Sequence, residues 1–117
     1  MVKKIAIIGC GGLSIKQLKL EVKALIEVND IARKKYADIY RVDSANLYKN
    51  TEEVPWDKLD VDMVIDCAPP RGRVKRAEFV LNSGKILLTT KPAAESIDEL
   101  EKLIELSQKS SQKIYVA

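Results

Sequence analysis

The sequence contains no histidine and only two cysteines among its 117 residues. Without histidine, a zinc site of the Cys/His type is nearly excluded, as is a serine or cysteine nucleophile activated by histidine. We therefore expect no metal site. Cys10 and Cys67 could form one disulfide at most, and we interpret them as small buried residues at strand ends in the reducing cytoplasm.

Long apolar runs and an excess of one charge are also missing. The longest runs, such as 5–8, fall far short of the ~20 residues that span a bilayer. Glycines follow this run directly, and no cleavage site of small residues is present, so we do not expect a signal peptide. Twenty basic and 17 acidic residues leave a net charge of only +3, which is too mild to indicate nucleic acid. We expect neither membrane nor nucleic acid as a partner.

What the chain does have is an ordinary composition for one folded domain. Hydrophobic residues make up 46% and charged residues 32%, which is enough to bury a core and argues against intrinsic disorder. No internal repeat, low-complexity tract or linker is present. We therefore expect residues 1–117 to form a single domain, without a second domain for substrate.

Short β-branched runs alternate with helical segments along the chain. We expect strands at 3–8, 24–28, 46–49, 61–67, 86–89 and 114–116, and helices at 14–20, 29–40, 73–81 and 96–107. Continuous apolar strands separated by helices are typical of a parallel sheet covered on both faces. The pattern predicts an α/β fold with a doubly wound, Rossmann-like parallel sheet.

The second strand has two possible positions. Alternation of apolar residues favours a strand at 24–28, because Asn29 and Asp30 then begin a helix through Tyr40. A helical stripe instead fits one long helix to Tyr36, with the strand at 39–42. We favour the first interpretation and leave the second open.

Local signals mark several other boundaries. Ser96 and Glu99 form a capping box at the start of the last helix, and Gly84 suits the end of the preceding one. Trp56 is interpreted as a lid on the core. The basic group after the fourth strand either forms a solvated helix start, which we favour, or attracts a phosphate or an acidic substrate; it consists of Arg71, Arg73, Lys75 and Arg76.

A glycine turn follows the first strand and opens a helix. It consists of Gly9, Cys10, Gly11, Gly12, Leu13 and Ser14. The first glycine permits a tight turn, and Gly11 lets the backbone approach a pyrophosphate, which would sit on the helix N-terminus. Ser14 replaces the third glycine of the dinucleotide fingerprint. The turn favours nucleotide binding, with a purely structural turn as the alternative.

A dinucleotide site also needs an acid after the second strand to bind the adenosine ribose. Glu27 is the favoured candidate, Asp30 is next in line, and Asp43 would serve if the long helix exists. Such an acid would repel a 2′-phosphate, so NAD is favoured over NADP, although Arg33 and Lys34 nearby keep NADP possible. A solvated surface acid is the alternative interpretation of Glu27.

Several segments resemble the glucose-fructose oxidoreductase/inositol dehydrogenase (Gfo/Idh/MocA) family. Residues 84–92, Gly-Lys-Ile-Leu-Leu-Thr-Thr-Lys-Pro, are similar to its Gly-Lys-His-Val-Leu-x-Glu-Lys-Pro signature. Residues 4–12, 24–37 and 62–70 also resemble its opening strand and glycine turn, its ribose-binding strand end, and its loop beside the nicotinamide. A weaker resemblance to L-aspartate dehydrogenase rests on 64–69 and 114–116.

The resemblance implies roles for individual residues. It places Glu27 and Asn29 at the ribose, and Cys67, Ala68 and Pro69 beside the nicotinamide half of the cofactor. Lys91 would lie near the nicotinamide, where it orients substrate or transfers a proton, and Pro92 would fix the chain direction behind it. The alternative for Lys91 is a surface lysine beside a turn proline.

Three departures from the family pattern are visible. The first helix is short, Thr90 replaces the glutamate before Lys-Pro, and Arg73 falls where the family usually has a histidine. The family's C-terminal α/β domain, which carries most substrate contacts, is absent from these residues.

Two functions fit these observations. The first is the cofactor domain of an NAD(P)-dependent oxidoreductase that acts on a CH–OH or CH–NH₂ group and is inactive as this chain alone. It would need a further domain or a partner chain to bind its small-molecule substrate. The second is a stand-alone nucleotide-binding or regulatory module without redox activity. A homo-oligomer is compatible with either.

Overall fold

The computed structural model describes residues 4–9 and 20–116. Within them the strands are β1 (Lys4–Ile8), β2 (Glu21–Ile26), β3 (Leu47–Tyr48), β4 (Met63–Asp66), β5 (Ile86–Thr89) and β6 (Ile114–Val116). The helices are α1 (Asp30–Tyr40), α2 (Arg73–Asn82) and α3 (Ile97–Lys109), and three short 3₁₀ turns are η1 (Ser44–Asn46), η2 (Thr51–Glu53) and η3 (Trp56–Lys58). None of the helices in this described part is long and apolar enough to cross a membrane.

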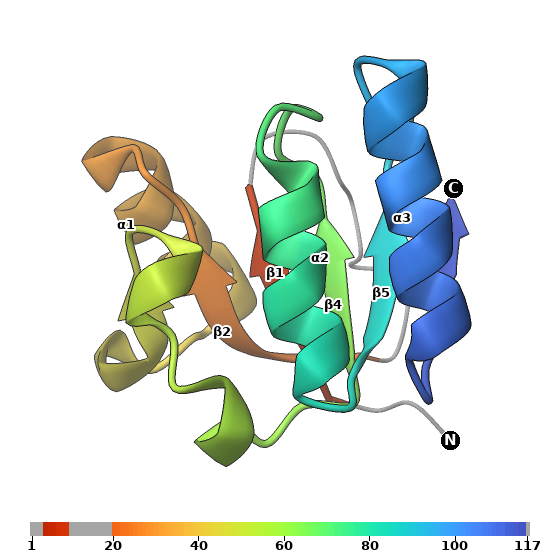
Figure 1. Ribbon diagram of the computed structural model, residues 1–117. Coiled ribbons are helices and arrows are strands. Elements are labelled where there is room, and N and C mark those ends of the chain that lie inside the picture. The colour runs from red at the N-terminus through yellow and green to blue at the C-terminus, as the bar shows by residue number, and fades with distance from the viewer. Residues whose placement is uncertain (1–3, 10–19, 117) are drawn as a thin grey trace.

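The strands form one parallel sheet in the order β3-β2-β1-β4-β5-β6 (Figure 1). From β1 the chain continues to β2 and β3 on one side, and then crosses back so that β4 pairs with the other side of β1. This reversal is the topological switch point of a doubly wound sheet, outside whose carboxyl ends ligands bind. The predicted Rossmann-like fold class is confirmed.

Alternate residues of the strands enter two apolar cores. On one face, Ala6, Ala24 and Val64 pack with residues of α2 and α3. On the other face, Ile7 and Leu25 pack with residues that include Ala37 of α1. Because both faces are covered, the buried positions of the central strands are mostly apolar, as their sequences indicated.

The favoured position of the second strand is confirmed, with shifted ends. β2 begins three residues before the predicted 24–28 and ends two residues before its predicted end. Residues 39–40 belong to α1, so the alternative strand at 39–42 is wrong. Asn29 decides the boundary, since its side chain accepts a hydrogen bond from the Ala32 N–H and caps α1. Of the helix predicted at 14–20, residues 14–19 lie outside the described part.

Several boundary signals are confirmed as well. The Ser96 hydroxyl accepts a hydrogen bond from the Glu99 N–H at the start of α3, and β5 spans the predicted 86–89. Gly84 follows α2 with a positive φ of 76°. Trp56 is buried over the core and donates from its indole N–H to the Thr51 carbonyl.

Candidate functional site

The turn after β1 is packed directly against the loop after β4. Gly9 has a φ of +77°, and a Cβ built on it would lie only 2.7 Å from the Ala68 backbone nitrogen. Backbone hydrogen bonds join the same region, from Gly9 N–H to the Ile26 carbonyl and from Cys67 N–H to the Ile8 carbonyl. Only glycine fits at position 9, both for its backbone angle and for its space.

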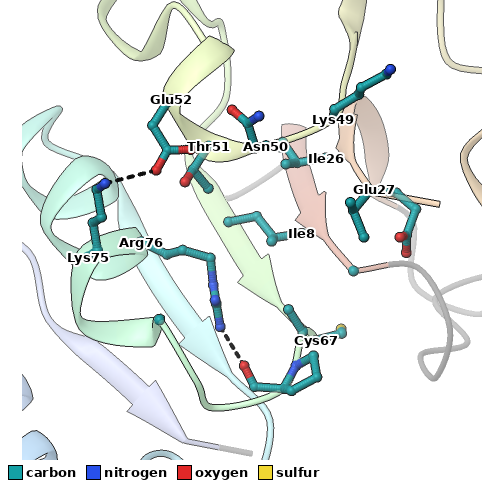
Figure 2. Close-up of a pocket in the computed structure, with 15 residues that line it drawn as sticks. Ile8, Ile26, Glu27, Lys49, Asn50, Thr51, Glu52, Cys67, Lys75 and Arg76 are labelled. Carbon is teal, nitrogen blue, oxygen red and sulfur yellow. Dashed lines mark hydrogen bonds and ion pairs between the residues drawn. The ribbon is translucent and has the colours of Figure 1, made fainter. Parts of the chain in front are cut away.

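A cavity of about 520 Å³ opens at this edge of the sheet, beside the ends of β1, β2 and β4 (Figure 2). It lies at the switch point, where the fold class binds its ligands. Its lining comprises Ile8, Gly9, Ile26, Glu27, Val28, Lys49, Asn50, Thr51, Glu52, Cys67, Ala68, Pro69, Gly72, Lys75 and Arg76.

Glu27 follows β2 directly and lines this cavity. Its carboxylate accepts a 2.9 Å hydrogen bond from the Asn29 N–H, and its carbonyl accepts one of 2.8 Å from the Arg33 guanidinium. Its own N–H donates to the Tyr48 carbonyl on β3. The first of these bonds fixes the carboxylate and the other two fix the backbone of Glu27 beside the cavity.

The other two acids lie elsewhere. Asp30 forms a 2.7 Å ion pair with Arg33, whose hydrogen bond lowers the pKa of this carboxyl. Asp43 caps turn η1 by accepting from the Ala45 N–H. Neither of them lines the cavity. Asn29 does not line the cavity either, and its side chain caps α1.

Charged residues from α2 and the β3 side meet across the cavity. Lys75 of α2 forms a 3.2 Å ion pair with Glu52 of η2, which Figure 2 shows spanning the two walls. Lys49 lines the same wall as Glu52. The mouth thus presents both signs of charge rather than a cationic patch.

The prediction of a solvated helix start at 71–76 is wrong for two of its four residues. The Arg73 side chain is only 1% exposed and the Arg76 side chain 14%. Both pair with Asp66, which is fully buried at the end of β4, at 3.5 Å from Arg73 Nε and 2.7 Å from Arg76 Nε. A buried carboxylate needs such partners because desolvation is costly. The two arginines therefore compensate the buried negative charge of Asp66.

Sequence reasoning missed this cluster. Its one visible signal was an aspartate inside the otherwise apolar strand 63–66. Burial of the two arginines depends on α2 packing over the end of β4, which no local pattern reveals. Within the described residues, no group of three or more Cys, Asp or Glu side chains is placed to hold a metal ion.

Comparison with known proteins identifies the family. Residues 3–117 match the model of the Gfo/Idh/MocA oxidoreductase family, NAD-binding Rossmann fold. The chain belongs to this family. It is the NAD-binding Rossmann domain, as the resemblance implied. No curated protein sequence matches it.

Solved structures of dehydrogenases share the fold. The WlbA dehydrogenase from Chromobacterium violaceum, in complex with NADH and UDP-GlcNAcA, superposes with a TM-score of 0.82 at 16% identity over 99% of this chain. Myo-inositol 2-dehydrogenase from Lactobacillus plantarum gives a TM-score of 0.85 at 16% identity over the whole chain. An oxidoreductase from Agrobacterium radiobacter, with NAD⁺, L-tartaric acid and magnesium, gives 0.85 at 15% identity over 99% of the chain. The chain spans only 35–36% of the length of these proteins.

Other residues that the Gfo/Idh/MocA resemblance singled out are now placed. Cys67, Ala68 and Pro69 line the cavity. Lys91 and Pro92 follow β5 and are exposed, joined by a cis peptide bond, and they do not line this cavity. Cys10, Gly11, Gly12 and Leu13 lie outside the described residues.

The Cys67 thiol is not activated. Burial, and after it the neighbouring Asp66 charge, raise its pKa to about 11 against an opposing effect of Arg73. At neutral pH the thiol is protonated, and it therefore lacks the thiolate that nucleophilic chemistry requires. Its place in the cavity is that of a small, half-buried wall residue.

Proposed function

We propose that this domain binds NADH along the carboxyl edge of its sheet, with the adenosine ribose at Glu27. The observation that carries the proposal is the position of this carboxylate, held by the Asn29 N–H at a cavity beside the switch point. An acid at the end of the second strand accepts hydrogen bonds from the ribose hydroxyls in this fold class.

The other contacts follow the path of the dinucleotide. Gly9 and the segment Cys10, Gly11, Gly12 and Leu13 would bind the pyrophosphate, and Asn29 would support the ribose. Cys67, Ala68 and Pro69 would line the path toward the nicotinamide. Lys91 is the proposed catalytic residue, with Pro92 fixing the direction of the chain behind it. These assignments are supported by the family match and by the shared edge of the sheet.

Glu27 also favours NADH over NADPH. A carboxylate beside the ribose would repel a 2′-phosphate. Of the two cations that follow Glu27 most closely in the sequence, Arg33 already donates to the Glu27 carbonyl and to Asp30. Because this guanidinium is committed to internal partners, it is less suited to receive a phosphate.

The chemistry expected of the whole enzyme is dehydrogenation of a CH–OH or CH–NH₂ group in a small molecule. The bound cofactor would accept or supply the hydride, and this domain would hold its nicotinamide against a substrate bound by a further domain or a partner chain. We expect this chain alone to bind cofactor without turning over substrate. A location in the cytoplasm suits the free Cys67 thiol, and a homo-oligomer stays a prediction.

Calorimetric titration of the chain with NADH and with NADPH tests the proposal. We expect NADH to bind with micromolar to millimolar affinity and NADPH to bind more weakly. Gly11→Val is the control, because a side chain there would occupy the place of the pyrophosphate and abolish binding. Absence of heat with both cofactors at millimolar concentration would refute the proposal. Binding without any later redox activity in a complete assembly would instead favour a nucleotide-binding module.

A further inference from the structure

The guanidinium of Arg73 is an interior hub of hydrogen bonds. Its Nη1 donates to the carbonyls of Thr90 at 3.0 Å, Pro92 at 2.6 Å and Ala93 at 3.4 Å. Its Nη2 donates to the carbonyls of Asp66, at 3.5 Å, and Ala68. All of these acceptors are backbone atoms. The side chain is among the largest in the protein to be fully buried.

The five carbonyls lie at or just after the carboxyl ends of two neighbouring strands. Asp66 is the last residue of β4 and Ala68 lies in the loop after it, whereas Thr90, Pro92 and Ala93 lie in the loop after β5. The strands run side by side, and the Thr90 N–H donates directly to the Asp66 carbonyl at 3.1 Å. The Thr90 hydroxyl also donates to that carbonyl, at 3.4 Å, and the Arg73 guanidinium adds hydrogen bonds to both loops. Its planar fork of donors can reach both at once, which the single ammonium of a lysine cannot.

Arg73 is not available to bind a ligand. Its Nε lies 3.5 Å from a carboxylate oxygen of Asp66, and both side chains are almost completely buried. Removing a buried cation from such partners would leave a carboxylate and several carbonyls poorly satisfied. A direct contact with cofactor or substrate is therefore the wrong role for this residue.

The Arg73 guanidinium binds the backbone on both sides of Lys91. The carbonyls of Thr90 and Pro92, which flank this residue, are both bound to Nη1, while the Lys91 side chain itself is exposed. The other guanidinium nitrogen, Nη2, donates to the carbonyl of Ala68, which lines the cavity. The guanidinium thereby fixes the backbone of Lys91 relative to that wall.

We propose that Arg73 is a positioning residue, which sets Lys91 and the loop 67–69 at a fixed separation around the nicotinamide half of the cofactor. The assignment rests on the proposed function, because it takes Lys91 to act at the nicotinamide. It predicts that Arg73 matters for the nicotinamide half of the ligand and not for the adenosine half.

Comparing NADH with ADP-ribose, which lacks the nicotinamide, separates the two halves. Titrations are made on the unaltered chain, Arg73→Lys and Arg73→Met, with circular dichroism melting to check the fold. We expect NADH affinity to fall about tenfold in both variants, the scale of one lost charged hydrogen bond, while ADP-ribose affinity is unchanged. Arg71→Met is the matched control, because it removes one exposed positive charge from the same segment, and it should affect neither ligand selectively.

A double variant tests whether Arg73 acts through Lys91. Lys91→Ala alone should lower the affinity for NADH without changing that for ADP-ribose. Adding Arg73→Lys to Lys91→Ala should not lower NADH affinity further relative to ADP-ribose affinity. A merely structural arginine would weaken both ligands equally, or would act as strongly without Lys91, and either result overturns the assignment. Failure of both Arg73 variants to fold would also overturn it in favour of a structural role. If the unaltered chain binds neither ligand, it is the proposed function that fails.

Discussion

At the scale of single residues, Glu27 differs from the two other acids that the sequence left open. Glu27 and Asp30 follow the favoured second strand closely, and Asp43 follows the alternative strand at 39–42. In the structure only Glu27 lines the cavity, whereas Asp30 is paired with Arg33 and Asp43 caps a turn. What distinguishes them is where β2 ends.

Replacing Glu27 with alanine should weaken NADH binding by about ten- to a hundredfold. The carboxylate would lose hydrogen bonds to the ribose, which cost roughly 1.5–3 kcal/mol when one partner is charged. NADPH should be affected less or should gain affinity, because its 2′-phosphate is no longer repelled. Calorimetry with both cofactors measures the change.

Asp43→Ala is the matched control, since it removes an equal charge from an acid outside the cavity. We expect it to leave both affinities unchanged. Loss of NADH binding in Asp43→Ala but not in Glu27→Ala would show that the ribose lies at another place.

At the scale of elements, local signals predicted most of the boundaries. β5 was located correctly, and the capping residues Asn29 and Ser96 begin the helices that they predicted. Each of these signals acts within four residues, so the sequence displays it directly. The ends of β2 were less accurate, because its length depends on pairing with β1, from Lys4↔Glu21 to Ile8↔Ile26.

Contacts between different helices and strands could not be predicted from the sequence. Arg73 and Arg76 look like the exposed first turn of a helix, since four cations within six residues normally favour solvent. Their burial comes from Asp66 on β4, and for Arg73 also from carbonyls after β5. These acceptors are brought together only by the strand order. The candidate site residues could therefore be predicted where they lie in a single loop. The buried ion pairs and the hydrogen bonds of Arg73 could not be predicted, because their partners come from α2, β4 and the loop after β5.

The end of α2 offers a test of backbone conformation alone. The Gly84 N–H donates to the Leu81 carbonyl and the Lys85 N–H to the Val80 carbonyl, which is the Schellman pattern. Gly84 has a φ of +76°, and a Cβ on it would meet no atom within 4 Å. Gly84→Ala should therefore lower the free energy of unfolding by about 1–2 kcal/mol through conformational strain, not collision.

Urea unfolding measures this change, with Gly84→Asn as the matched control. Asparagine adopts the left-handed conformation more readily than alanine, so it should cost less. An asparagine variant as unstable as the alanine variant would indicate that backbone strain is not the cause.

At the scale of the whole molecule, the strand order brings the candidate binding residues to one edge of the sheet. Gly9, Glu27, Cys67 and Lys91 each follow a strand, and parallel strands end on the same side. The bodies of the strands are left apolar for packing between α1 on one face and α2 with α3 on the other (Figure 1). The apolar interior of the sheet thus supplies stability, whereas the proposed binding residues lie at its edge, so substitutions at the edge can be tested without disrupting the core.

The surface charges of the molecule give it a defined sensitivity to acid. Among the described residues, four exposed carboxyl groups have pKa values below their ordinary values of 3.8 for Asp and 4.5 for Glu. The causes are hydrogen bonds from Arg33 to Asp30, from Lys4 to Asp60, from Lys109 to Glu105, and from backbone and then Lys75 to Glu52. A carboxyl whose pKa is lower in the folded than in the unfolded chain stabilises the fold above its ordinary pKa. That contribution is lost as the pH falls through the lowered value.

We therefore expect the melting temperature to stay level from about pH 8 to about pH 5 and to fall below about pH 4. Each pair lies on the surface, so its contribution is small and is screened by salt. Thermal melts across this range, at low salt and at about 1 M KCl, should show a smaller acid loss at high salt, where the Debye length is about 3 Å. An equal loss at both salt concentrations would contradict the prediction.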